Sequence, residues 1–212
     1  MDCELRIEKI QNPKLKDKEG IIKMIVVRTF IAINMTSEIK ETLSKIQSEL
    51  KKANADVKWV GHEGMHITLK FLGNVIIGQL ESVYQMVLEA TSNFNQFPLS
   101  LTSVGAFPNL SSPKVIWVGV DKGKEECIKL AKRIDDNLLR LGFPVEQKEI
   151  IPHLTLGRVK SQRDRNELAK LITKLKTNSF GQMKVSNIEV MGSQLTPKGA
   201  IYTSLRELAL MK

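Results

Sequence analysis

The sequence is poor in cysteine, proline and aromatic residues, and these scarcities exclude several classes of protein. Its 212 residues include two cysteines, seven prolines and 5% aromatic residues. Cys3 and Cys127 lack the spacing of metal or redox motifs, which argues against a disulfide scaffold and favours reduced thiols. No apolar run approaches the roughly 20 residues that a transmembrane helix needs, so we expect no membrane anchor.

The chain also lacks a balance of charge. Its formal net charge of +9 and its pI near 9.5 favour anionic partners, with nucleic acid first, although a solvated basic surface would give the same numbers. The N-terminus has no apolar core of a secretory signal, which predicts a cytoplasmic protein. Residues 1–23 carry six Lys/Arg and five Asp/Glu. We therefore expect a mobile N-terminal extension over 1–23 and one folded domain over 24–212.

Histidine is rare too, yet it carries the most informative pattern of the chain. Two of the three histidines open the same phrase, His66-Ile67-Thr68-Leu69 and His153-Leu154-Thr155-Leu156. Two copies in a chain of this length indicate an internal repeat.

Hydrophobic periodicity predicts strands and helices in an order that is repeated once, with no Gly/Ser linker between the halves. The predicted strands cover 25–33, 57–60, 66–72, 98–107, 115–120, 153–159, 183–190 and 201–208. The predicted helices cover about 37–50, 80–88, 125–141 and 163–174. This order favours a duplicated α+β domain with two joined lobes and helices on one face of largely antiparallel sheets.

Each motif strand presents an imidazole and a hydroxyl on one face, because side chains at i and i+2 leave a strand on the same side. Two imidazoles facing one cleft can divide proton transfer, one as general base and the other as general acid. Threonine hydroxyls can hydrogen-bond the nonbridging oxygens of a phosphate. A lone strand histidine is more often structural, but the repeat favours in-line displacement at phosphorus.

A metal site is the other interpretation of these histidines. His62 and His66 are four residues apart, as two ligands on a helix would be. The intervening glycine disfavours a helix there, and the second motif offers only one histidine. We therefore expect no metal and no cofactor.

At these residues the chain resembles the two-histidine (2H) phosphoesterase superfamily, and within it the RNA 2′,3′-cyclic phosphodiesterases of the LigT/ThpR type, also called 2′-5′ RNA ligases. The similarity spans about 24–210. Its segments are Arg28–Ile33, Lys58–Val60, His66–Gly73, Pro113–Val120 and Pro152–Lys160.

The resemblance implies a bilobal fold in which two antiparallel sheets line a central cleft with helices outside. It also implies metal-independent hydrolysis of 2′,3′-cyclic phosphate RNA ends to a 2′-phosphate, together with reversible 2′-5′ RNA ligation. His66 carries over as the general acid for the leaving 3′ oxygen and His153 as the general base for water. Thr68 and Thr155 carry over as phosphate ligands.

Three further residues are candidates for substrate binding. Arg158 matches an arginine that often follows the second motif in this family, but simple alternation places it opposite His153, so a phosphate contact needs a bend at Gly157. Lys70 shares the face of His66 if the strand continues unbroken. Phe71 can stack on an RNA base. A surface role for Arg158 and a solvated Lys70 are the alternatives.

The expected partner is RNA with 2′,3′-cyclic phosphate ends, tRNA fragments included, bound by a monomer. Two other functions stay open: an RNA-binding or end-protecting module with incidental turnover, and a 2H phosphodiesterase that acts on another cyclic or 2′-5′ nucleotide. The sequence leaves open the natural RNA, the direction of the reaction and the order of acid and base.

Overall fold

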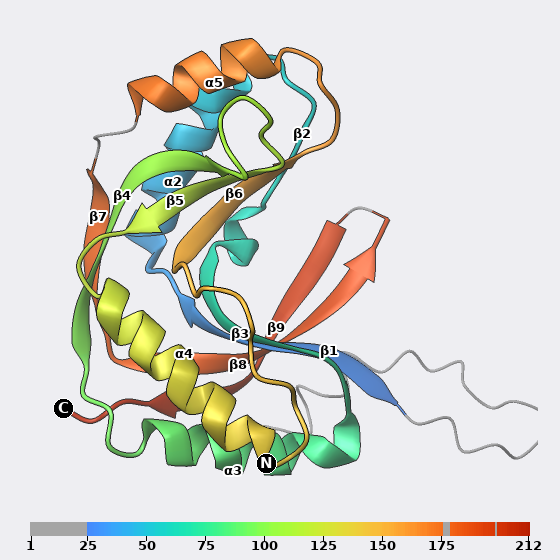
Figure 1. Ribbon diagram of the computed structural model, residues 1–212, viewed down its shortest axis with the longest axis vertical. Helices are drawn as coiled ribbons and strands as arrows, with labels where there is room; N and C mark the ends of the chain where they lie inside the picture. Colours follow the sequence, from blue (N-terminus) through green and yellow to red (C-terminus); the bar gives the residue numbers. More distant parts are fainter. Residues whose placement is uncertain (1–24, 176–178, 198) are drawn as a thin grey trace, which may run out of the picture.

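A computed structural model describes residues 25–175, 179–197 and 199–212, so the prediction for 1–23 lies outside the described residues. Helices lie between single strands or groups of consecutive strands along the described chain (Figure 1). The strands are β1 (Val26–Asn34), β2 (Val57–Trp59), β3 (His66–Ile76), β4 (Phe97–Phe107), β5 (Val115–Val120), β6 (His153–Val159), β7 (Ser179–Val185), β8 (Asn187–Thr196) and β9 (Gly199–Ala209). The helices are α2 (Ser37–Lys51), α3 (Leu80–Thr91), α4 (Lys124–Leu139) and α5 (Arg165–Lys174), with short 3-10 turns η1 (His62–Gly64) and η2 (Ile77–Gln79).

The strands form one nine-stranded sheet in the order β7-β4-β5-β6-β3-β1-β8-β9, with β2 paired to β6. All strand pairs within the described ranges are antiparallel. The middle of the sheet is its weakest seam, because β3 and β6 share the single pair Ile67–Leu154. The two predicted sheets are therefore the halves of one curled sheet: half-sheet one (β3, β1, β8, β9) and half-sheet two (β7, β4, β5, β6, β2).

The crossover helices are exchanged between the halves (Figure 1). Helix α2 follows β1 of half-sheet one but packs against β7 and α5, whereas α4 follows β5 of half-sheet two but packs against α3 and β3. Their apolar residues are spaced for this, with Leu43 and Leu50 buried on α2 and Leu130 and Ile134 buried on α4. The exchange joins both halves into one continuous hydrophobic core. Within the described ranges, no helix is long and apolar enough to cross a membrane.

Two predicted strand boundaries are wrong. The single strand predicted over 183–190 is two strands, because β7 ends at Val185 and β8 begins at Asn187. Strand β7 pairs with β4 and β8 pairs with β1, so the chain passes between the half-sheets at Ser186 without a glycine or proline to mark the change. The strand predicted to end at Leu72 continues to Ile76, with Gly73 inside it at a φ of +76°. Glycine accepts this conformation without steric strain.

Cys127 is buried in α4 and forms no disulfide with any residue that the structure describes. Burial, and secondarily the charge of Glu126, raise the pKa of its thiol to about 12. The thiol therefore stays protonated near neutral pH, as an inert core residue does. Cys3 lies outside the described residues.

Candidate active site

The structure brings the four motif residues together on two neighbouring strands. The pairing of Ile67 with Leu154 is antiparallel, so continuing this register places His66 beside Thr155 and Thr68 beside His153. All four side chains line one cleft. Each histidine therefore lies next to the threonine of the other motif, as a two-fold axis through the Ile67–Leu154 pair requires.

Both motif strands bulge at the leucine that ends the motif. Leu69 has no partner on β1, and Leu156 has none on β5. A bulge adds one residue to a strand and thereby reverses the face of the residues that follow it. Lys70 is paired with the core residue Ile31, while Phe71 and Arg158, each five residues after a histidine, line the cleft.

The ring of His66 lies between two aromatic side chains. Phe30 stacks on its ring with centroids 4.8 Å apart, and Tyr202 contacts it edge-on at 5.3 Å. Its Nδ1 is buried and has no hydrogen-bond partner among the residues described. Burial, and secondarily the positive charge of Lys40, lower the pKa of His66 from 6.5 to about 4. The free protein therefore holds this imidazole neutral near pH 7.

His153 has a polar contact that His66 lacks. Its Nδ1 lies 2.7 Å from the carbonyl oxygen of Ile151, and Phe107 contacts the ring edge-on at 5.0 Å. A carbonyl can only accept a hydrogen bond, so we assign the proton of the neutral ring to Nδ1. Nε2 is then the nitrogen with the free lone pair.

The rest of the cleft wall mixes apolar and charged side chains, and most of the charged ones are cationic. The hydroxyls of Thr68 and Thr155 are half-buried and make no hydrogen bond to any described residue, which leaves them available to a substrate. The charged residues of the lining are Arg28, Lys58, Lys70, Lys148, Arg158 and Lys160 against Glu146 and Glu149. Such a cleft suits an anionic substrate.

The model of the LigT like Phosphoesterase family matches the chain twice, at residues 33–117 and 118–202. Each match contains one His-x-Thr-Leu motif. The chain belongs to the LigT-like phosphoesterase family. Its predicted duplication is thus confirmed.

Two curated relatives of this LigT-like phosphoesterase match along almost their whole length. A Methanothermobacter thermautotrophicus protein named RNA 2′,3′-cyclic phosphodiesterase is 38% identical over 87% of this chain and 99% of its own. A protein of the same name from Archaeoglobus fulgidus is 41% identical over 85% of this chain and 98% of its own.

Solved structures share the fold. A Thermus thermophilus protein superposes with a TM-score of 0.74 at 25% identity, over 86% of this chain and 97% of its own. E. coli LigT in its apo form gives a TM-score of 0.68 at 22% identity, over 89% of this chain and 99% of its own. The bilobal LigT-like fold expected from the sequence is confirmed.

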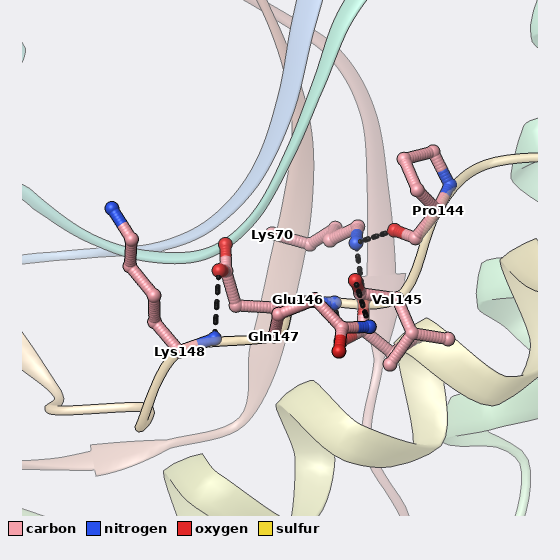
Figure 2. Close-up of polar contacts among 7 residues, drawn as sticks. Lys70, Pro144, Val145, Glu146, Gln147 and Lys148 are labelled. Atoms are coloured by element: carbon pink, nitrogen blue, oxygen red, sulfur yellow. Dashed lines mark hydrogen bonds and ion pairs between the residues drawn. The ribbon is translucent and has the colours of Figure 1, made fainter.

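The three predicted substrate-binding residues of this LigT-like phosphoesterase differ in what they contact. Phe71 is 63% exposed in the cleft, and Arg158 is exposed there too, because of the bulge at Leu156 rather than a bend at Gly157. Lys70 borders the cleft, but its ammonium is buried 2.5 Å from Oδ1 of Asp135 and donates to the carbonyl oxygen of Pro144 (Figure 2). The expected common face with His66 is wrong, because the bulge at Leu69 breaks the alternation.

The residues that surround the two histidines could not be predicted from the sequence. Phe30, Phe107 and Tyr202 come from three strands, and an aromatic residue in a strand is ordinary core by pattern alone. The Ile151 carbonyl carried no signal, because it is a backbone group. Within the described ranges, no three or more His, Cys, Asp or Glu residues cluster as metal ligands would.

Proposed function

We propose that this protein hydrolyses the 2′,3′-cyclic phosphate at RNA 3′ ends to a 2′-phosphate without a metal ion. The observation that carries this proposal is the set of four motif side chains in one cleft. Two imidazoles and two unpaired hydroxyls come there from equivalent positions of a duplicated fold. Relatives that are 38% and 41% identical carry the name of this activity over nearly their whole length.

His153 is proposed as the general base. Its Nδ1–H is held by the Ile151 carbonyl, so Nε2 can take a proton from water. The water oxygen then bonds to phosphorus, opposite the ribose 3′ oxygen, as the bond from phosphorus to that oxygen breaks. The hydroxyls of Thr68 and Thr155 donate to the nonbridging oxygens, where negative charge develops.

His66 is proposed as the general acid that protonates the departing 3′ oxygen. Its pKa of about 4 in the free protein means that a proton must arrive with the substrate. A bound phosphate is negatively charged and favours the imidazolium form, so it raises this pKa. An imidazolium with a low pKa in an apolar pocket is a strong proton donor, and a poor leaving group such as a ribose oxygen needs one. Solvent restores both protonation states after release of the product.

The cleft wall is proposed to hold the rest of the RNA. Phe71 offers an exposed ring on which the terminal base can stack, and Arg158 can pair with a phosphate. Lys58 is paired with Arg158 across β2 and β6, and Lys160 directly follows β6 and also lines the cleft. These cations can contact the upstream backbone of a single strand.

We further propose a cytoplasmic monomer that acts in RNA processing and whose substrates include tRNA fragments. The 2′-5′ joining of ends is the same displacement with a 5′-hydroxyl of a second RNA end in place of water. The 5′ oxygen bonds to phosphorus as the bond to the 3′ oxygen breaks, so no nucleotide cofactor is needed. Light scattering would report the mass in solution, and sequencing of RNA with 2′-phosphate ends from cells with and without the gene would identify the substrates.

The test is incubation of the purified protein, in EDTA, with an RNA that ends in a 2′,3′-cyclic phosphate. Wild type should yield a 2′-phosphate, and His66→Ala and His153→Ala should yield almost none. His62→Ala is the matched control, because this exposed third histidine is absent from the cleft lining. Turnover that requires a metal would contradict the mechanism. Salt-sensitive RNA binding without turnover would favour an end-protecting module, and turnover of another cyclic or 2′-5′ nucleotide alone would change the substrate.

A further inference from the structure

The segment between α4 and β6 forms one wall of the cleft although it has no regular secondary structure. Residues 144–149 are mostly exposed, and the cleft lining includes Glu146, Lys148 and the 149–151 stretch. The segment ends at Ile151, whose carbonyl accepts the hydrogen bond from His153. Its position therefore bears directly on the proposed general base.

Two hydrogen bonds tie this wall segment (144–151) to the body of the protein. The ammonium of Lys70 donates to the Pro144 carbonyl at 2.5 Å, and the backbone N–H of Glu146 donates to Oδ2 of Asp135 at 3.0 Å (Figure 2). Apart from the contact with His153, every other hydrogen bond of the segment among the described residues is internal to it. Lys70 and Asp135 are therefore its polar anchors.

The two anchors form a buried ion pair. The side chains of Lys70 and Asp135 are 7% and 4% exposed, and their charged atoms are 2.5 Å apart. Removing two charges from water is unfavourable, and well-packed apolar residues often replace such pairs without loss of stability. What distinguishes this pair is that each member also hydrogen-bonds one backbone group of the wall segment. Lys70 donates to a carbonyl and Asp135 accepts from an N–H, so the pair specifies where that backbone lies.

We propose that Lys70 and Asp135 are positioning residues for His153, acting through the wall segment. This inference rests on the proposed function. Lys70 follows the bulge of the first motif strand, and Asp135 lies on the helix that covers that strand. Half-sheet one thereby fixes the Ile151 carbonyl, which holds the proton of His153 on Nδ1. One motif strand thus supports the histidine of the other.

The test replaces the pair with apolar residues, Lys70→Met/Asp135→Leu, so that no unpaired charge is left in the core. Three quantities are measured: the melting temperature, the nitrogen-15 shifts of the His153 ring, and kcat and KM on a nucleoside 2′,3′-cyclic phosphate. We expect a folded protein whose His153 loses its preference for the Nδ1–H tautomer. We expect kcat to fall at least about tenfold, with KM changed less than about threefold, because only the position of the base is disturbed.

The matched control is Thr91→Val, a buried polar residue of α3 whose hydroxyl bonds within its own helix. It should change the melting temperature but neither kcat nor the His153 shifts. A double variant that retains both the tautomer and kcat would overturn the proposal.

A measurement on the wild-type protein keeps the proposal testable if the double variant fails to fold. The Glu146 amide should exchange its hydrogen more slowly than the neighbouring exposed amides of Gln147 and Glu149, and His153 should be the Nδ1–H tautomer. Equal exchange at the three amides would overturn the anchoring. Both signatures in a protein that hydrolyses no cyclic phosphate would contradict the proposed function and leave the positioning intact.

Discussion

The two motif strands share the residues His, Thr and Leu of their motif and a bulge at the same leucine, yet the two histidines have different surroundings. His66 is enclosed by Phe30 and Tyr202, and its Nδ1 finds no partner among the described residues. His153 donates from Nδ1 to the Ile151 carbonyl. The repeated sequence thus supplies two equivalent positions, and the flanking elements give each imidazole different contacts.

The difference continues past the bulges. Phe71 and Arg158 are equivalent by position, but one offers an aromatic ring and the other a cation. At the preceding position Lys70 reaches Asp135 on α4, whereas the equivalent residue of the second motif is Gly157. A symmetric scaffold has therefore become an asymmetric cleft, as a reaction with different entering and leaving groups requires.

The largest expected effect comes from removing either imidazole. His66→Ala and His153→Ala should each lower kcat on an RNA cyclic phosphate by about 10²–10⁴, the usual scale of acid–base assistance. Single-turnover kinetics would measure this. A loss below tenfold in either variant would break the claim that both histidines take part.

The second comparison is between two buried polar residues, Asp135 on α4 and Gln47 on α2. Asp135→Ala leaves Lys70 charged and unpaired, so the free energy of unfolding should fall by about 3–5 kcal/mol. Gln47 donates from Nε2 to the carbonyls of Val60 and Leu156 at 2.8 and 2.9 Å. Gln47→Leu leaves neutral groups without their donor, so we expect about 1–3 kcal/mol. Urea unfolding would measure both losses in the free energy of unfolding. A larger loss for Gln47→Leu than for Asp135→Ala would contradict this order.

A third prediction follows from the burial of His66 among aromatic side chains. The pKa of His66 is about 4 in the folded protein against 6.5 for an unperturbed imidazole, so the unfolded chain takes up a proton first as the pH falls. Wild type should lose up to about 3 kcal/mol of stability between pH 6.5 and 4 through this group. His66→Ala should lack this component, and His153→Ala should retain it. Urea titrations at pH 7 and 4.5 would show it, and equal pH dependence in wild type and His66→Ala would contradict the buried environment.

The smallest effects concern the residues after the bulges. Phe71→Ala should weaken RNA binding by about 1–3 kcal/mol without changing its salt dependence, because stacking is not ionic. Arg158→Ala should reduce the slope of log affinity against log salt by about 1. Binding of an uncleavable RNA at several salt concentrations would separate the two. Identical salt slopes in both variants would rule out different roles for the two positions.

The sequence predicted the element order, the duplication and the meeting of the two motifs at one cleft, because these depend on local periodicity and on a repeated motif. Its failures have physical causes. Strand alternation assigned Lys70 and Arg158 to the wrong faces, since a bulge at a leucine leaves no mark in composition. The break at Ser186 depends on which half-sheet each flanking strand joins. The aromatic residues around His66 come from β1 and β9, which are far apart in the sequence and meet only in the fold.

The proposed roles of His66 as acid and His153 as base are tested most directly by a change of leaving group. The measurement compares kcat/KM of both alanine variants on a nucleoside 2′,3′-cyclic phosphate and on a 3′-deoxynucleoside 2′-(4-nitrophenyl phosphate), whose phenolate leaves without a proton. His66→Ala should lose at least about 10² on the cyclic substrate and less than about tenfold on the aryl ester, whereas His153→Ala should lose about 10² or more on both. Equal losses for His66→Ala on the two substrates, or the opposite pattern, would contradict the assignment of His66 as the acid and His153 as the base.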